Sequence, residues 1–175
     1  ANGMVNPRIG GVETQEAAQN HDHWSSPLEG KNRGRGVATG FWMNGSGAAC
    51  ATANVNFNGT VNLTIGSVDV GGTRPGAAQQ FAEVLGIAAE DVNPQVGDTD
   101  TIGWTSMTGG SGAAFKTGWA AYEAAQDVKR QMIERAALLW ERPSEEIEHV
   151  DGNFRHISDN ELSMSFRELS ALIPE

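Results

Sequence analysis

The sequence predicts an α+β fold: a mixed, mostly antiparallel sheet of about four strands, packed by two main helices, with a C-terminal hairpin and helix as an appendage. Short runs of alternating apolar residues, the pattern of half-buried strands, occur between residues 37 and 65 and again at 91–96. The dipeptide Asn58-Gly59, a strong hairpin signal, separates two of these runs. Apolar residues at steps of three and four then predict a long helix over residues 117–140.

Length and composition limit the class of protein. The 175 residues suffice for one well-cored domain. The net charge of −10 argues against a general nucleic-acid or anionic-membrane surface, and Cys50, the one cysteine, allows no intrachain disulfide and no thiolate metal cluster. No apolar run approaches the roughly 18 residues of a membrane span, and the polar N-terminus shows no signal peptide. We therefore expect no nucleic-acid partner, no membrane and a cytoplasmic location, with a periplasmic one as the alternative.

The N-terminal part differs from the rest of the chain. Residues 1–31 show no sustained hydrophobic period, so we expect an extended arm with at most a short helical turn near residues 15–18. His21-Asp22-His23 has the spacing of a metal pair, but on a loop this pattern is more typical of solvated surface. A lobe over residues 32–142 and a hairpin-helix appendage of the same domain over 143–175 complete the expected organisation.

The expected strands follow from period-two alternation. The first is formed by alternating larger residues: Val37, Thr39, Phe41 and Met43. The second covers residues 50–57 with one apolar face: Ala51, Ala53, Val55 and Phe57. The third contains Val61, Leu63 and Ile65 and pairs antiparallel with the second through Asn58-Gly59. The fourth lies at 91–96 and leads into a turn that contains Asp98 and Asp100.

The expected helices have recognisable ends. The first runs from Pro75 to about Leu85 and ends at Gly86, a residue suited to the helix C-terminus. The long helix is expected to bury one stripe: Ala121, Ala125, Val128, Met132, Ala136 and Leu139. Pro143 stops it, Ser144 opens a short turn, and residues 148–157 form a hairpin around Asp151-Gly152. Ser163 or Ser165 then caps a last helix that packs through three apolar residues: Phe166, Leu169 and Ile173.

Two glycine-rich turns, at residues 66–76 and 108–112, each lead from a strand-like stretch into a helix. Thr73 is a candidate N-cap, and Pro75 suits a first helical turn. Unpaired N–H groups and the positive end of the helix dipole make such a turn an anion site, most naturally for phosphate or another oxygen-rich group. A single turn of this kind is more often a tight connection without a ligand, but two in one small domain favour a ligand. Neither turn has the spacing of a P-loop or of a dinucleotide fingerprint.

Other chemistries fit the residues less well. Ser111 in Gly-Gly-Ser-Gly-Ala approximates a nucleophile elbow and would need His149 or His156 as its base. Both histidines fall in the predicted hairpin, and we prefer Ser111 as an N-cap or phosphate ligand. Asp98 and Asp100 could be an acid and a base, although capping of their own turn by Asp98 is the better interpretation. We assign no catalytic residue and no metal ligand in this chain.

Seven stretches in order resemble one protein family. They are GRGVA at 34–38, VNFNGTV at 55–61, GSVDVGGTR at 66–74, FAEVLGI at 81–87, GDTD at 97–100, TGGS at 108–111 and GWAAYEA at 118–124. Together they resemble the molybdopterin-binding large subunit of the xanthine dehydrogenase and aldehyde oxidase family, the molybdenum hydroxylases. The likeness runs from about Arg33 to the end of the long helix and is looser in the tail.

The resemblance implies a cofactor site, an activity and partners. The residues that it places at molybdopterin, possibly in its dinucleotide form, are Val70, Gly71, Gly72, Thr73, Thr108, Gly109, Gly110 and Ser111. The cofactor's sulfurs, not protein side chains, would hold the molybdenum. The implied activity is hydroxylation of an aldehyde or N-heterocycle. The implied partners are the rest of the large subunit and iron–sulfur and FAD subunits or domains.

The sequence also departs from the family pattern. Many members have Gly-Gln-Gly at the first turn, where this chain has Gly71-Gly72-Thr73, and many carry arginine where this chain has Gly112. The family's catalytic glutamate lies in a later motif that this sequence does not reach. We therefore expect one lobe of an oxidoreductase, inactive when made alone. The alternative is a non-catalytic binding or scaffold module derived from that lobe.

Overall fold

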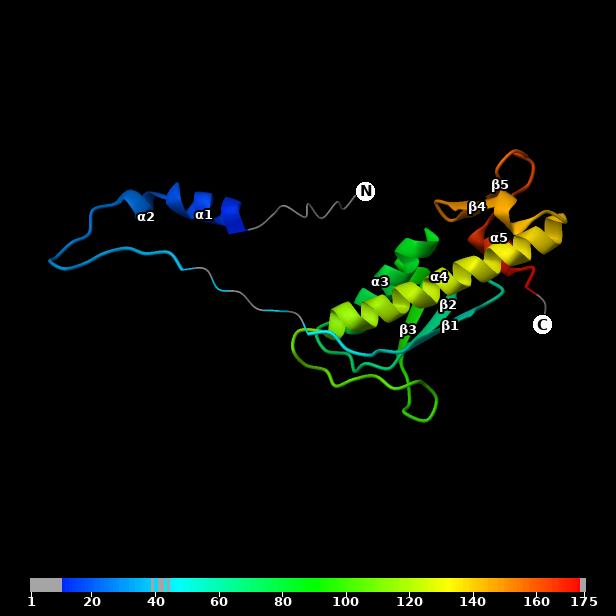
Figure 1. Ribbon diagram of the computed structural model, residues 1–175, viewed down its shortest axis with the longest axis horizontal. Coiled ribbons are helices and arrows are strands. Elements are labelled where there is room, and N and C mark those ends of the chain that lie inside the picture. The colour runs from blue at the N-terminus through cyan, green and yellow to red at the C-terminus, as the bar shows by residue number, and fades with distance from the viewer. Residues whose placement is uncertain (1–10, 39, 41–42, 44, 174–175) are drawn as a thin grey trace. The chain divides into compact units, whose positions relative to one another are not determined.

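The computed structural model describes residues 11–38, 40, 43 and 45–173 (Figure 1). Its contacts divide the chain into two units, Ala1–Trp42 and Met43–Glu175. Within the described residues no helix is both long and apolar enough to cross a membrane. The expected domain boundaries at 31/32 and 142/143 stay predictions.

The first unit contains two helices, α1 (Gly11–Gln19) and α2 (Asp22–Ser25), and neither buries a residue. The expectation of an extended arm with at most a short helical turn is therefore wrong for residues 11–19. Strong helix formers such as Glu16 and Ala17 explain α1. The helix has no apolar stripe, so hydrophobic periodicity does not predict it. The suspected metal pair instead begins α2, where the His21 ring accepts a hydrogen bond from the His23 N–H.

The first expected strand is not found in the described residues. Thr39 and Phe41 lie outside them, and the described members Val37 and Met43 are exposed and belong to no strand.

The second unit begins with a mixed three-stranded sheet. β1 (Ala51–Val55) pairs antiparallel with β2 (Val61–Ile65), as predicted, with Ala53 opposite Leu63. Gly59 closes the connecting loop in the left-handed region at φ 81°. β3 (Val92–Val96) pairs with β2 in parallel, at the sheet edge where its Pro94 is tolerated.

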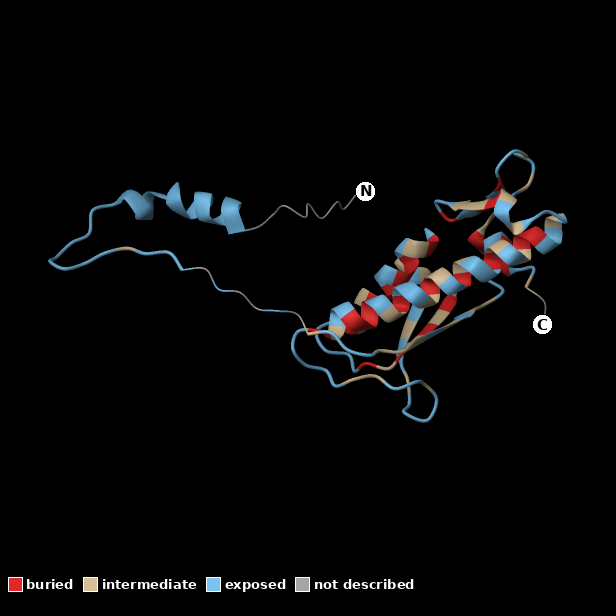
Figure 2. Ribbon diagram, in the orientation of Figure 1, coloured by how far each residue is buried: buried red, intermediate tan, exposed pale blue. Residues whose placement is uncertain are grey.

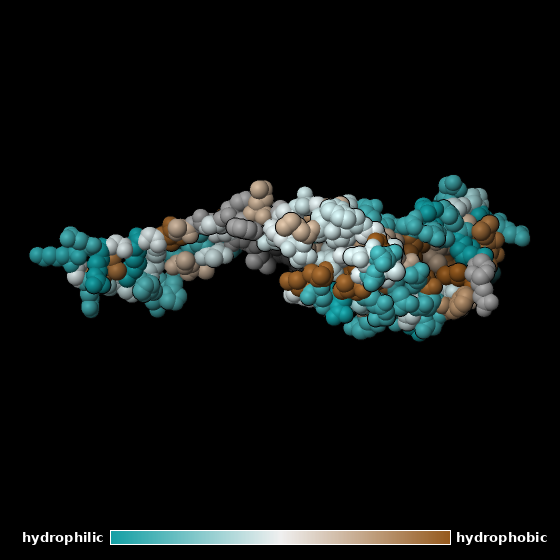
Figure 3. Space-filling model, turned by 90° about the horizontal axis from the view of Figure 1, so that it is seen from below, coloured by the Kyte–Doolittle hydropathy of each residue, from teal (hydrophilic) through white to brown (hydrophobic). Residues whose placement is uncertain are grey.

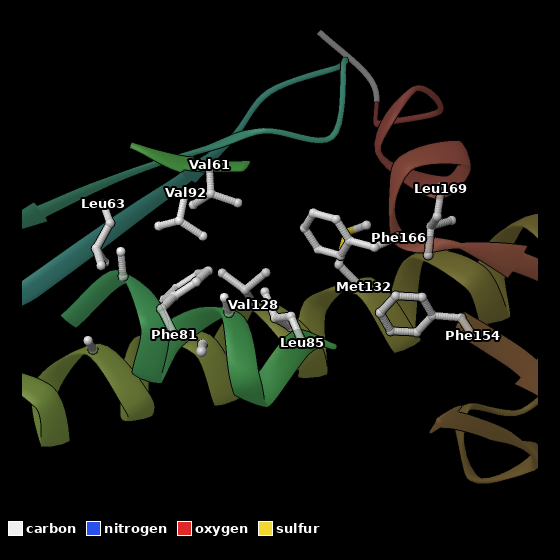
Figure 4. Close-up of a cluster of buried hydrophobic side chains, with 14 of the residues drawn as sticks. Val61, Leu63, Phe81, Leu85, Val92, Val128, Met132, Phe154, Phe166 and Leu169 are labelled. Carbon is white, nitrogen blue, oxygen red and sulfur yellow. The ribbon is translucent and has the colours of Figure 1, made fainter. Parts of the chain in front are cut away.

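Two helices pack on this sheet and form the main core. They are α3 (Thr73–Leu85) and α4 (Ala113–Trp140) (Figure 1). Figure 4 shows Phe81 and Leu85 of α3 and Val128 of α4 facing Val61 and Leu63 of the sheet. Figure 2 shows the buried residues of both helices as stripes. The predicted stripe of α4 is confirmed except at Leu139, which is 37% exposed because Ala137 faces the core in this last turn.

A 3₁₀ turn, η1 (Ala89–Asp91), leads into β3, and a second one, η2 (Ser144–Glu146), leads from α4 into a second sheet in the C-terminal part. Its antiparallel strands are β4 (Ile147–Val150), β5 (Asn153–His156) and β6 (Ser163–Ser165), followed by α5 (Phe166–Ser170). The predicted hairpin and the Ser165 cap are confirmed. The α+β class is confirmed, but six strands lie in two sheets instead of about four in one. β6 went unpredicted because two of its three residues are serine.

The second sheet shares the core of the first. Phe154, Phe166 and Leu169 lie with Met132 of α4 in the same buried cluster (Figure 4). Gly86 and Gly152, both in the left-handed region, bring the end of α3 against the β4–β5 turn. A Cβ atom on Gly86 would overlap the backbone of Gly152 and lie 2.9 Å from the Asp151 carbonyl carbon. Only glycine fits at this contact.

We therefore expect Gly86→Ala to lower the free energy of unfolding by about 3 kcal/mol, through left-handed strain and overlap with Gly152. Urea unfolding monitored by circular dichroism measures this. Gly76→Ala is the matched control in the same helix, because nothing lies within 4 Å of a Cβ there and alanine is the better helix former. Equal stability of Gly86→Ala and the unmodified chain would contradict the contact.

Candidate functional site

The two glycine-rich turns meet where α3 and α4 begin. The helices run parallel, so their N-termini lie at the same end of the unit (Figure 1). A Cβ atom on Gly118 of α4 would overlap the side-chain amide of Gln80 of α3, so glycine leaves room for this side chain between the helices. Between the two N-termini lies a cavity of about 240 Å³. Its lining residues are Val70, Gly71, Gly72, Thr73, Gly76, Gln80, Ser111, Ala113 and Ala114.

The cavity gathers much of the predicted cofactor set. Five of the eight predicted residues line it: Val70, Gly71, Gly72, Thr73 and Ser111. Thr108, Gly109 and Gly110 belong to the same loop as Ser111 but do not line the cavity. The role of all eight toward a cofactor stays a prediction.

The first turn enters α3 through two consecutive left-handed glycines, Gly71 at φ 61° and Gly72 at φ 82°. Gly72 is the N-cap, so the expectation of Thr73 as N-cap is wrong. The Thr73 hydroxyl instead donates to the Val70 carbonyl at 2.7 Å and closes the turn. Pro75 is the third helical residue, where its missing N–H has no intrahelical partner to lose.

The side chain that caps α3 is Asp69, which sequence reasoning missed. Its carboxylate accepts the Arg74 backbone N–H at 3.1 Å and the Arg74 Nε–H at 2.8 Å. These bonds, the side-chain one foremost, hold the pKa of Asp69 below its ordinary value. The positive end of α3 is thus already matched by a negative charge. The only signal in the sequence was an aspartate five residues before an arginine.

The second turn leaves the N-terminus of α4 open. Gly110 and Ser111 are left-handed, at φ 59° and 57°, and Gly112 is the N-cap without a side-chain hydrogen bond. The expectation of Ser111 as N-cap is therefore wrong. No described residue accepts a hydrogen bond from the N–H groups of Ala113 or Ala114, and the first turn of α4 contains no acidic residue. These two residues line the cavity, so unpaired donors of a 28-residue helix lie beside it.

The second turn is held by a loop at residues 45–50. The Gly45 N–H donates to the Gly110 carbonyl, and a Cβ atom on Gly112 would overlap the Gly45 carbonyl oxygen. Just before the turn, the Ser106 N–H donates to the Ala48 carbonyl at 2.9 Å. Sequence reasoning did not predict the contact of this loop with residues 106–112, because no local pattern reports such a pairing.

The rival chemistries find no support in the described contacts. The His149 Nε2 lies 3.1 Å from the Leu85 carbonyl at the C-terminal end of α3, and burial lowers the pKa of this ring. The His156 Nε2 lies 2.8 Å from the Glu146 carboxylate of η2, so neither histidine pairs with Ser111. Asp98 caps its own turn, as predicted, by accepting the Asp100 N–H at 2.8 Å.

Over the described ranges, no group of three or more His, Cys, Asp or Glu residues could hold a metal ion. Any metal at this site would therefore need ligands from a bound cofactor or from elsewhere.

Comparison with known proteins relates this chain to one family. A family model described as a molybdopterin cofactor-binding domain matches residues 11–173. The chain is 28% identical, with a TM-score of 0.66, to a structure of copper- and molybdenum-containing CO dehydrogenase in its carbon monoxide-reduced state. It is also 28% identical, with a TM-score of 0.65, to a reconstituted CO dehydrogenase from Oligotropha carboxidovorans. With quinoline 2-oxidoreductase from Pseudomonas putida 86, the sequence identity is 29% and the TM-score is 0.59.

These matches cover 70–71% of this chain but only 16% of each of the three structures. The chain thus spans about one sixth of the length of the proteins it resembles.

Proposed function

Because the chain belongs to the molybdopterin cofactor-binding domain family, we propose that the cavity between the N-termini of α3 and α4 holds part of the molybdopterin cofactor. The solved structures that this chain resembles include a molybdenum-containing CO dehydrogenase and a quinoline 2-oxidoreductase. The observation that carries the proposal is the cavity itself, where both glycine-rich turns meet beside open backbone donors. The cofactor, when bound, supplies redox chemistry at molybdenum.

The residues of the cavity fit a flat, phosphorylated pterin. The N–H groups of Ala113 and Ala114 and the Ser111 hydroxyl would bind the phosphate, because α3 is already capped by Asp69. The backbone at Gly71 would lie against the pterin, since a Cβ there would find open space within 4 Å. The protein would thus bind and orient the cofactor through backbone groups and small side chains.

Among the described residues, none that lines the cavity carries a carboxylate for proton transfer. Asp69 is engaged by Arg74, and Asp98 caps its own turn. We propose that this chain orients the cofactor while a base from elsewhere completes a hydroxylase for an aldehyde or N-heterocycle, in the cytoplasm. The rest of a large subunit and iron–sulfur and FAD partners would supply the missing parts.

Exposed apolar side chains around the two turns support such partners. Figure 3 shows apolar surface of the second unit among hydrophilic residues. Four exposed apolar residues lie in or next to the two turns: Val68, Val70, Met107 and Phe115. Several apolar side chains exposed around both turns favour contact with further polypeptide.

Ala114 tests where the phosphate binds. Ala114→Asp places a negative charge in the first turn of α4, which should raise the free energy of unfolding by about 0.3–1 kcal/mol relative to Ala114→Asn. The same charge should weaken binding of a phosphorylated pterin by about tenfold, or 1.4 kcal/mol, relative to Ala114→Asn. Equilibrium dialysis at low salt measures binding, and urea unfolding measures stability.

Opposite changes in stability and binding support the assignment. Equal pterin affinity of the aspartate and asparagine variants would contradict it. An unmodified chain that binds no phosphorylated pterin would favour the non-catalytic scaffold instead.

The isolated chain should be incomplete. Purified from cells that make the cofactor, it should carry far less than one molybdenum per chain and should not oxidise an aldehyde or a purine with an artificial electron acceptor. Contacts to a phosphate from one side only are weakened by water and salt. Molybdenum analysis and the oxidation assay check this, with a complete molybdenum hydroxylase from the same cells as the control. Stoichiometric molybdenum with turnover would contradict the proposal.

A further inference from the structure

Lys116, in the first turns of α4, is buried in an unusual way. Its side chain belongs to a residue only 5% exposed, although lysine is rarely buried without a paired carboxylate. The ammonium instead donates to three oxygens of one loop: the Ser106 carbonyl at 2.7 Å, the Ser106 hydroxyl at 2.6 Å and the Met107 carbonyl at 2.6 Å. Three donors meet three acceptors, so the group is satisfied without a salt bridge.

The three oxygens lie directly before the second glycine-rich turn. Ser106 and Met107 precede Thr108 in a segment without regular secondary structure. On its other side, Ser106 is bound to the Ala48 carbonyl through its N–H and, at 3.0 Å, through its hydroxyl. Lys116 thus ties the start of α4 to the loop that carries Ser111, and the contact between Gly45 and Gly112 holds the far end of that loop.

The placement of this charge is costly for the helix. Positive side chains in a first turn oppose the helix dipole. None of the ion pairs among the described residues includes Lys116. The three oxygens satisfy the donors of the ammonium, and an anionic group bound at the N-terminus of α4 would add a favourable interaction with its charge. Lys116 does not line the 240 Å³ cavity, so it would act on a ligand through the loop.

We propose that Lys116 is a positioning residue: its buried ammonium holds residues 106–111 in the conformation that keeps the N-terminus of α4 open to the phosphate of the cofactor. This inference rests on the proposed function of the cavity. The conformation of the second turn would thus depend on the Lys116 side chain, which lies outside residues 108–112.

Lys116→Met tests the proposal, because it keeps the length of the side chain and removes its three donors. Amide hydrogen exchange of residues 105–112 should become at least tenfold faster, while β2 and the middle of α4 keep their protection. Binding of a phosphorylated pterin should weaken by about tenfold. Lys116→Arg should restore much of both, since its guanidinium can donate to the same oxygens.

Two matched variants separate positioning from general stability. Lys129→Met makes the same change further along α4 and should leave loop exchange and pterin binding unchanged. Ser106→Ala removes one of the three acceptors, together with the bond from the hydroxyl to the Ala48 carbonyl. It should give a change in the same direction if Lys116→Met fails to fold.

Faster exchange spread evenly over the whole unit, or no rescue by arginine, would overturn the positioning role. The exchange experiment needs no ligand. If the unmodified chain binds no pterin, the proposed function fails, while local loosening of the loop in Lys116→Met still decides whether the residue holds it.

Discussion

The close approach of α3 and α4 at Gln80 and Gly118 is the constraint on which the candidate site depends. A Cβ atom at Gly118 would overlap the side-chain amide of Gln80, so this side chain, which lines the cavity, would have to move. The β-sheet and the core residues of both helices fix the same arrangement from the other side. The site is therefore a consequence of how two parallel helices pack, and its backbone donors are held in place by the core.

The two helix N-termini at the cavity are not equivalent. α3 is capped within the chain by the Asp69 carboxylate, which also pairs with Arg74. α4 has neither a side-chain cap nor an acid in its first turn, and a buried lysine stands there instead. An anionic ligand would gain more from α4 than from α3. This difference between the helix ends would orient a bound cofactor. Its phosphate would lie toward α4, and its flat part would lie toward the glycines of the first turn.

Local patterns predicted what depends on neighbours in the sequence. The hairpin at Asn58-Gly59, the apolar stripe of α4 and the turn of Asp98 each follow from periodicity or from one side chain near its own backbone. Features that need distant residues were missed. The contact of Gly45 with Gly112 joins segments more than 60 residues apart, and the bonds of Lys116 depend on how the loop folds back onto α4. The family resemblance located the turns but could not show which helix end is open.

The most direct test of the account is an amide NMR titration of the ¹⁵N-labelled chain with a phosphorylated pterin. The central claim is that backbone groups at the two N-termini form the binding surface. The account predicts the largest shift changes at residues 70–72 and 111–114, with little change in the strands of the second sheet. Largest changes in that sheet, or no change at saturating pterin, would contradict it.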